Sequence, residues 1–257
     1  MSDHTDHTIS QDHKAKLHRI GEGFCGTVWA ATSDDKEISA AWVFKREDGG
    51  PSRSLHNDYR MHRRILNSHP ILRFCDEEAA GGKILSSRLA ARDLVQRYQQ
   101  KLPHSTLPWS QGDTTDIRAR VLYARAMAEA LATIHWLGQM DGNDIEFVLA
   151  PPPADGTHEG DTWVNILGPH ALWILDFDLV RIITMNEHGV LQAVTAFQRN
   201  DPFYPRPGRG SILWEVFRKQ YLSTSHDCIT TVMDGSGQRE RLALSQRFIE
   251  ILEVEGP

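Results

Sequence analysis

The sequence predicts an α+β fold with two lobes, a β-rich N-terminal lobe and a helical C-terminal lobe. Residues 17–48 alternate apolar and polar positions around a Ser-Asp-Asp turn, which is typical of two or three antiparallel strands. Residues 101–113 contain two prolines and a glycine and predict a connecting loop. We therefore expect a tail over 1–16, an N-terminal lobe over 17–100 and, after this hinge, a C-terminal lobe over 114–257.

The remaining elements follow from apolar periodicity and turn residues. A helix is predicted over 54–66, because its apolar positions recur at helical spacing and His69-Pro70 follows it. Residues 114–138 form the clearest predicted helix, which Gly138 ends. In chain order, the other expected elements are a strand and a helix within 71–98, short apolar strands at 145–150 and 171–183, and helices that begin near Ser211 and Arg239.

The composition fits an ordinary soluble globular protein of 257 residues, with 40% apolar and 24% charged residues. No apolar run approaches the ~20 residues that span a bilayer, and the first residues lack the apolar centre of a signal peptide. The three cysteines, an odd number without ligand spacing, indicate neither a disulfide framework nor a zinc site. We therefore expect a cytoplasmic protein with no membrane partner and no bound metal.

Charge is distributed unevenly along the chain. Residues 1–125 hold 19 Lys/Arg and 16 Asp/Glu, whereas residues 126–257 hold 9 and 18. A mildly basic first half and a strongly acidic second half suit two kinds of ligand, an anion and a cation. Ordinary solvated surfaces are the alternative interpretation.

A glycine-rich segment, IGEGFCGTVW, spaces Gly21, Gly23 and Gly26 so that a backbone turn can approach a phosphate. Lys45 follows at the end of the apolar segment AAWVF, where a lysine can point into the same cleft. Asp176 ends another apolar strand, LWIL, and a carboxylate there can bind a metal or a cation. A plain glycine-containing hairpin is the alternative for the first motif.

In this order the three elements resemble the protein-kinase fold over residues 17–182, with Asp58 near the place of the helix glutamate that pairs the lysine. The catalytic positions depart from the kinase pattern. Asn143 stands at the place of the catalytic base, and an amide accepts no proton at neutral pH. Val148 stands at the place of the metal-binding asparagine, and a shift of one residue that makes Asp144 the base does not restore that asparagine. Phosphoryl transfer is therefore disfavoured.

Carboxylates gather on the two segments around the predicted strands. They are Asp141, Asp144, Glu146, Asp176 and Asp178, of which the last replaces a kinase glycine. If the segments pair as in kinases, three or four of these acids converge. Their natural counterpart is a guanidinium, which is planar, permanently charged and suited to bidentate pairing with carboxylates. Alternatively, some of the acids lie on the outer face and cap turns.

A second resemblance covers the C-terminal half and is carried by three stretches. IHWLGQMDGNDIEFVLA, LWILDFDLV and AFQRNDPFYPRP look like a fungal family that is loosely labelled zinc-finger-like, although this chain lacks the Cys/His pattern for that label. Some members of the family resemble arginine-containing cyclodipeptide synthases of natural-product clusters. This resemblance implies an aminoacyltransferase-type enzyme that joins arginine and a second amino acid, both from aminoacyl-tRNA, into a cyclo-Arg-Xaa diketopiperazine.

Such an enzyme needs no cofactor, because its substrates are already activated as esters. The partners implied are arginyl-tRNA and a second aminoacyl-tRNA, with an aminoacyl-tRNA synthetase as an additional candidate. The candidate catalytic residues are Asp144, Glu146, Asp176 and the thiol of Cys25. The candidate substrate-binding residues are Lys45, Asp141, Asn143, Asp178 and Asp201. The candidate nucleic-acid contacts are Arg60, Arg63, Arg64, Arg88 and Arg92, and their alternative is a solvated helix face.

Two other functions remain open at this stage. A divergent ATP-dependent small-molecule kinase would use Asp144 and Asp176 with Mg²⁺. A pseudokinase-like binding module would recognise a basic peptide through the acids. Val148 and Asn143 disfavour the kinase, and the residues alone do not separate the synthase from the binding module.

Overall fold

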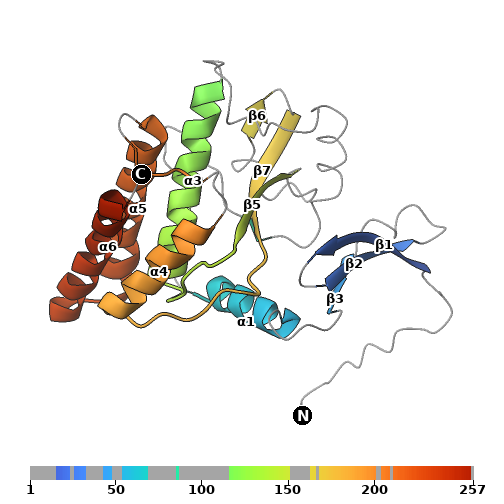
Figure 1. Ribbon diagram of the computed structural model, residues 1–257, viewed down its shortest axis with the longest axis horizontal. Coiled ribbons are helices and arrows are strands. Elements are labelled where there is room, and N and C mark those ends of the chain that lie inside the picture. The colour runs from blue at the N-terminus through green and yellow to red at the C-terminus, as the bar shows by residue number, and fades with distance from the viewer. Residues whose placement is uncertain are drawn as a thin grey trace, which may run out of the picture. The chain divides into compact units, whose positions relative to one another are not determined.

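The computed structural model describes ten stretches of the chain. They are residues 16–23, 26–32, 43–47, 54–68, 85–86, 116–150, 163–165, 168–200, 204–208 and 211–255. The chain divides into two compact units, residues 1–50 and residues 51–257, and each unit is described by itself (Figure 1).

The first unit holds a three-stranded antiparallel sheet in the order β1 (Lys16–Gly23), β2 (Gly26–Thr32) and β3 (Val43–Arg46), which confirms the predicted strands. Gly26 has φ +135°, and a Cβ there would lie 1.9 Å from the carbonyl oxygen of Arg46. Only glycine fits this position, which begins β2. Lys45 pairs with Val28 across β2 and β3.

The sheet of the second unit is built around β7 (Gly168–Leu175). Both β5 (Glu146–Ala150) and β6 (Trp163–Asn165) pair antiparallel with β7, and β4 (Leu85–Ser86) pairs parallel with it. Leu172 and Ile174 of β7 are buried in the main apolar core, whereas the alternate residues point to the other face of the sheet.

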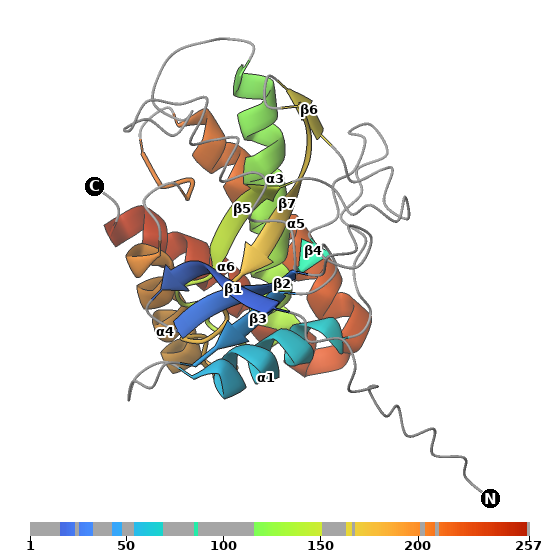
Figure 2. The same cartoon turned by 90° about the vertical axis from the view of Figure 1, so that its right-hand side faces the viewer.

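Five helices are described in the second unit. They are α1 (Leu55–Leu66), α3 (Asp116–Trp136), α4 (Glu187–Arg199), α5 (Ile212–Val232) and α6 (Gly235–Glu255). The most buried is α3, whose Ala128 and Ala132 are fully buried. It lies between α5 and the β5–β7 sheet (Figure 1), and Figure 2 shows it running behind that sheet. The small residues of α3 permit this close approach on both sides.

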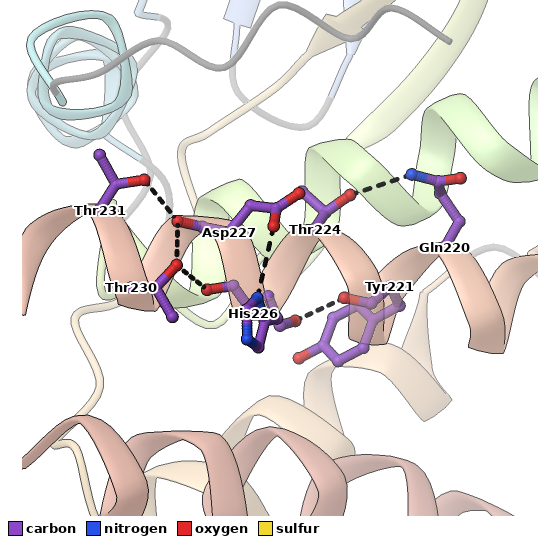
Figure 3. Close-up of polar contacts among 8 residues, drawn as sticks. Gln220, Tyr221, Thr224, His226, Asp227, Thr230 and Thr231 are labelled. Carbon is purple, nitrogen blue, oxygen red and sulfur yellow. Dashed lines mark hydrogen bonds and ion pairs between the residues drawn. The ribbon is translucent and has the colours of Figure 1, made fainter.

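Polar side chains of α5 bond mainly to their own helix. The hydroxyls of Thr230 and Thr231 donate to carbonyls of His226 and Asp227, and Gln220 donates to the hydroxyl of Thr224 (Figure 3). The neighbouring side chains of His226 and Asp227 are exposed and face each other at 3.4 Å. The threonine hydroxyls therefore satisfy helix carbonyls and do not form a nucleophile–base arrangement with this histidine and carboxylate.

The described elements confirm a mixed α+β architecture and depart from the sequence prediction in four places. The helix α4 was not predicted, β7 ends at Leu175 rather than at residue 183, and α6 begins at Gly235 rather than near Arg239. The helix α1 belongs to the second unit, although sequence analysis groups it with residues 17–100. The predicted tail, the hinge and most of residues 71–98 lie outside the described residues. Within the described stretches, no helix combines the length and apolarity needed to cross a membrane.

Candidate functional site

Two segments that carry most of the predicted acids are paired with each other at both ends. At one end β5 and β7 begin their pairing with Glu146 opposite Leu175. At the other end an isolated antiparallel bridge joins Met140 to Ile182. The intervening residues 141–145 and 176–181 therefore form two facing turns, which confirms the predicted side-by-side placement of the two segments.

The sequence around these turns is strongly acidic. Residues 126–180 contain nine Asp or Glu residues and no Lys or Arg. The next basic residue, Arg181, directs its guanidinium at the backbone carbonyls of Asp178 and Val180.

Asp141 is buried, with 4% of its surface exposed, and both of its carboxylate oxygens are engaged. Its Oδ1 accepts from the backbone N–H groups of Asn143 at 3.1 Å and Arg181 at 2.9 Å. Its Oδ2 accepts from Nε2 of Gln192 at 2.8 Å. Asp141 thus joins both turns to α4, and the amide of Asn143 is turned towards the carbonyl of Leu179.

Asp178 is buried even more deeply, with 1% of its surface exposed. Its turn is fixed to α1 by three contacts. The carboxylate of Asp58 accepts from the backbone N–H of Phe177 at 2.9 Å, Asn57 donates to the carbonyl of Asp178 at 2.8 Å, and the ring of His62 stacks on Phe177. In the second unit Asp58 therefore caps a turn, a role that the comparison with the kinase glutamate did not predict.

The remaining acids are accessible. Glu146 is exposed, whereas Asp144 and Asp176 are half-buried. Asp144 has φ +64° and Asp176 has φ +65°, a left-handed conformation that is uncommon for residues other than glycine. Such backbone conformations persist where surrounding contacts enforce them, and they cluster at ligand sites. The three acids predicted as catalytic are thus less buried than Asp141 and Asp178.

A buried amide and a buried phenol hold the turn of Asp144. Asn200 accepts from the N–H of Asp144 at 2.7 Å and donates to the carbonyl of Gly142 at 2.9 Å. The hydroxyl of Tyr204 donates to the carbonyl of Ile145 at 2.8 Å. The sequence did not predict a place for these two residues in the site. The available signal is the position of Asn200 directly after the amphipathic α4, where a surface loop does not require an asparagine.

The other predicted site residues divide into three groups. Lys45 is exposed in the first unit. On α1, Arg60 and Arg63 are exposed, whereas Arg64 donates from Nε to the carbonyl of Gly138. Four predicted residues lie outside the described stretches, namely Cys25, Arg88, Arg92 and Asp201.

His135 lies behind the site and is fully enclosed. Its Nδ1 is 2.9 Å from the hydroxyl of Tyr221, which also accepts from the indole of Trp136. Burial lowers the pKa of His135 to about 3, and the backbone carbonyl of Asp141 opposes this shift only in part. His135 is therefore neutral near pH 7 and serves the core rather than proton transfer. It also borders a cavity of about 10 Å³, which has room for one water molecule and not for a substrate.

No group of three or more metal-binding side chains occurs among the described residues. Burial raises the pKa of the Cys228 thiol to about 12, which disfavours the thiolate that zinc requires. A family model named DUF3669 and described as "Zinc finger protein" matches residues 172–232, about a quarter of the chain. No curated protein and no solved structure matches the chain. The matched stretch runs from β7 through α5. It includes Asp176, Asp178, Asn200 and Tyr204, so the similarity to this family covers one of the two segments of the candidate site and the residues that support the other.

Proposed function

We propose that the protein is an aminoacyl-tRNA-dependent cyclodipeptide synthase that joins arginine and a second amino acid into a cyclo-Arg-Xaa diketopiperazine, on a two-lobed kinase-like scaffold. The order of elements supports the scaffold: a glycine hairpin, a strand with Lys45, the helix α1, the long helix α3 and the paired strands β5 and β7.

One observation carries the proposal. Asp144, Glu146 and Asp176 are accessible acids at the end of one strand pair, within a stretch of 55 residues that contains no Lys or Arg. A guanidinium satisfies such a site, because it forms bidentate hydrogen bonds with carboxylates and stays charged at any physiological pH. The carboxylate of the buried Asp141 supports both turns, so we assign Asp141 to positioning and the accessible acids to the substrate.

The reaction needs one proton acceptor and no phosphate transfer. The amine of one aminoacyl group attacks the ester carbonyl of the other, an amide bond forms, and the ester bond to the tRNA 3′ oxygen breaks. The proton lost by the amine passes to an accessible carboxylate, and the freed tRNA hydroxyl gains a proton. The same exchange within the dipeptidyl ester closes the ring and releases the second tRNA.

The decisive experiment uses purified, previously charged tRNAs, so that no ATP is present. Arginyl-tRNA and a mixture of other aminoacyl-tRNAs are incubated with the protein, and cyclic dipeptides are identified by mass spectrometry. We expect an arginine-containing product that disappears when the tRNA is digested beforehand. A product that survives this digestion, or no product at all, would reject the synthase.

Variants of the accessible acids refine the test. Asp144→Asn, Glu146→Gln and Asp176→Asn each remove one charge at nearly constant volume. We expect the variant that replaces the general base to form the product about 10²–10⁴-fold more slowly. Glu240→Gln is the matched control, because Glu240 is an exposed acid of α6. Equal activity in all four variants would exclude the acids from the chemistry.

A divergent small-molecule kinase is the second candidate, favoured by Lys45, which stands opposite Val28 in the glycine-containing sheet. That function predicts Mg²⁺-dependent ATP turnover that Lys45→Ala abolishes. The charged-tRNA experiment contains no ATP, so its product cannot arise from this activity. Binding of arginine-rich peptides without any turnover would instead identify a binding module.

A further inference from the structure

The side chain of Asn200 is built into the turn that presents Asp144. Asn200 follows α4, is 5% exposed, and uses both ends of its amide. Its Oδ1 accepts from the N–H of Asp144, and its Nδ2 donates to the carbonyl of Gly142. A flipped amide would set donor against donor and acceptor against acceptor, so only one orientation satisfies both contacts.

These two bonds bracket a strained stretch of backbone. Gly142 has φ +62° and Asp144 has φ +64°. A glycine adopts this conformation without cost, whereas an aspartate there costs of the order of 1 kcal/mol or more. The bond from the Asp144 N–H to Asn200 stabilises the left-handed conformation at the residue that bears the cost.

Asn200 is itself held from the other side. The guanidinium of Arg206 donates to the carbonyls of Phe197 and Asn200 and lies 4.5 Å from the centre of the Phe197 ring. The hydroxyl of Tyr204 lies 3.4 Å from Nδ2 of Asn200 and donates to Ile145. The amide is therefore fixed to the end of α4 before any ligand arrives.

We propose that Asn200 is a positioning residue that sets the direction of the Asp144 carboxylate through the Asp144 backbone, with Tyr204 as its second support. This inference rests on the proposed function for the role of Asp144. The contacts themselves do not depend on the reaction, and the experiment separates the two.

The activity test is a double-mutant cycle between Asn200→Ala and Asp144→Asn, measured as the rate of cyclic dipeptide formation from charged tRNAs. We expect Asn200→Ala to lower kcat at least tenfold, with a smaller change in KM, in the wild-type background. In the Asp144→Asn background we expect the same substitution to change kcat less than twofold, because the carboxylate that it positions is gone. Equal losses in both backgrounds would show a purely structural role and overturn the inference.

Asn186→Ala is the matched control. Asn186 is also an asparagine at an end of α4, and its side chain caps the helix by accepting from Gly189 N–H at 3.2 Å. Its loss destabilises the same helix at the end opposite to Asn200. We expect a lower melting temperature with unchanged kcat. Tyr204→Phe, which keeps the ring, tests the second support if Asn200→Ala folds poorly, and we expect a kcat between those of the wild type and Asn200→Ala.

A second measurement does not need the reaction. Amide hydrogen exchange of residues 142–146 is compared in the wild type, Asn200→Ala and Asn186→Ala. We expect the Asp144 amide to exchange about tenfold faster or more in Asn200→Ala, since it loses its acceptor, and not in Asn186→Ala. An unchanged rate at Asp144 overturns the inference even if the protein is a synthase. Faster exchange in Asn200→Ala, together with a wild type that makes no product, rejects the proposed function and leaves the hydrogen bond of Asn200 to Asp144 established.

Discussion

Nδ2 of Asn57 lies 2.8 Å from the backbone carbonyl oxygen of Asp178, and it also lies within reach of the carbonyl of Val180 at 3.0 Å. The next residue, Asp58, accepts from the backbone N–H of Phe177. Two consecutive side chains of α1 thus satisfy both donors and acceptors of a turn that begins more than a hundred residues later. The position of the acids at 176 and 178 therefore depends on α1.

The first prediction concerns this link. Asn57→Ala leaves several carbonyls of the 177–180 turn without their donor, and we expect a loss of about 1–3 kcal/mol in the free energy of unfolding. His56→Ala is the control, because His56 is the exposed neighbour on the same helix, and we expect a change within about 0.5 kcal/mol. Urea titration followed by circular dichroism measures both. Equal stabilities of the two variants would contradict a structural link through Asn57.

The second prediction separates two acids of the site by their burial. Asp141→Asn replaces one carboxylate oxygen by an NH₂ group that cannot accept a hydrogen bond from the N–H groups around it. We expect a loss of about 1–3 kcal/mol in stability. Glu146→Gln, at an exposed position, should change stability by less than about 0.5 kcal/mol. Comparable losses in the two variants would mean that Asp141 does not join the two turns.

The third prediction is a loss of stability on acidification. The folded-state pKa of His135, about 3, lies below its ordinary value of 6.5, so the folded protein favours the neutral ring. The contribution to stability is complete above pH 6.5 and is lost as the pH falls towards 3. At pH 5 we expect a loss of about 2 kcal/mol relative to pH 7 from this residue alone.

The variant His135→Gln removes the titrating ring while keeping a polar group near Tyr221. Its absolute stability is lower, so the informative quantity is the slope of unfolding free energy against pH between 7 and 5. We expect a shallower slope than in the wild type. Identical slopes in the wild type and in His135→Gln would refute the third prediction.

The sequence predicts the elements whose signals are local. The structure confirms the strands predicted within residues 17–48, the helix predicted after Ser54 and the long helix predicted before Gly138. The helix α4 also carries local signals, namely Asn186 as an N-cap and Val190, Ala193, Val194 and Phe197 at helical spacing.

The site was predictable only in part. The run of acids and the pairing of their two segments follow from residue types and strand patterns. Which acids are buried and which are accessible does not follow, because that depends on contacts with Asn57, Gln192 and Asn200, which are distant in sequence. The left-handed backbone at Asp144 and Asp176 likewise does not follow from residue type, because aspartate adopts this conformation more often than most residues but not as a rule. Polar residues that end or line amphipathic helices are where such partners should be sought.

The fourth prediction concerns the three arginines of α1. The sequence assigns all three the same role, whereas in the structure they differ in exposure and contacts. Arg60 and Arg63 are exposed, and the guanidinium of Arg63 lies 5.9 Å from the centre of the Tyr59 ring. Arg64 is half-buried and bonds to the carbonyl of Gly138, which precedes the acidic turn. If tRNA binds this face of α1, the first two arginines meet phosphates and the third supports the fold.

Fluorescence titration with tRNA at several salt concentrations tests this distinction. We expect Arg60→Ala and Arg63→Ala to weaken binding and to lower the slope of log affinity against log salt by about one each, because each phosphate contact releases about one counterion. Their melting temperatures should be unchanged. Arg64→Ala should keep the wild-type slope and lose about 1–3 kcal/mol in stability, since the buried carbonyl of Gly138 loses the hydrogen bond that Arg64 donates. If all three variants keep the wild-type slope, tRNA binds elsewhere, because a helix face that touches phosphates must show the loss of each charge in the salt dependence.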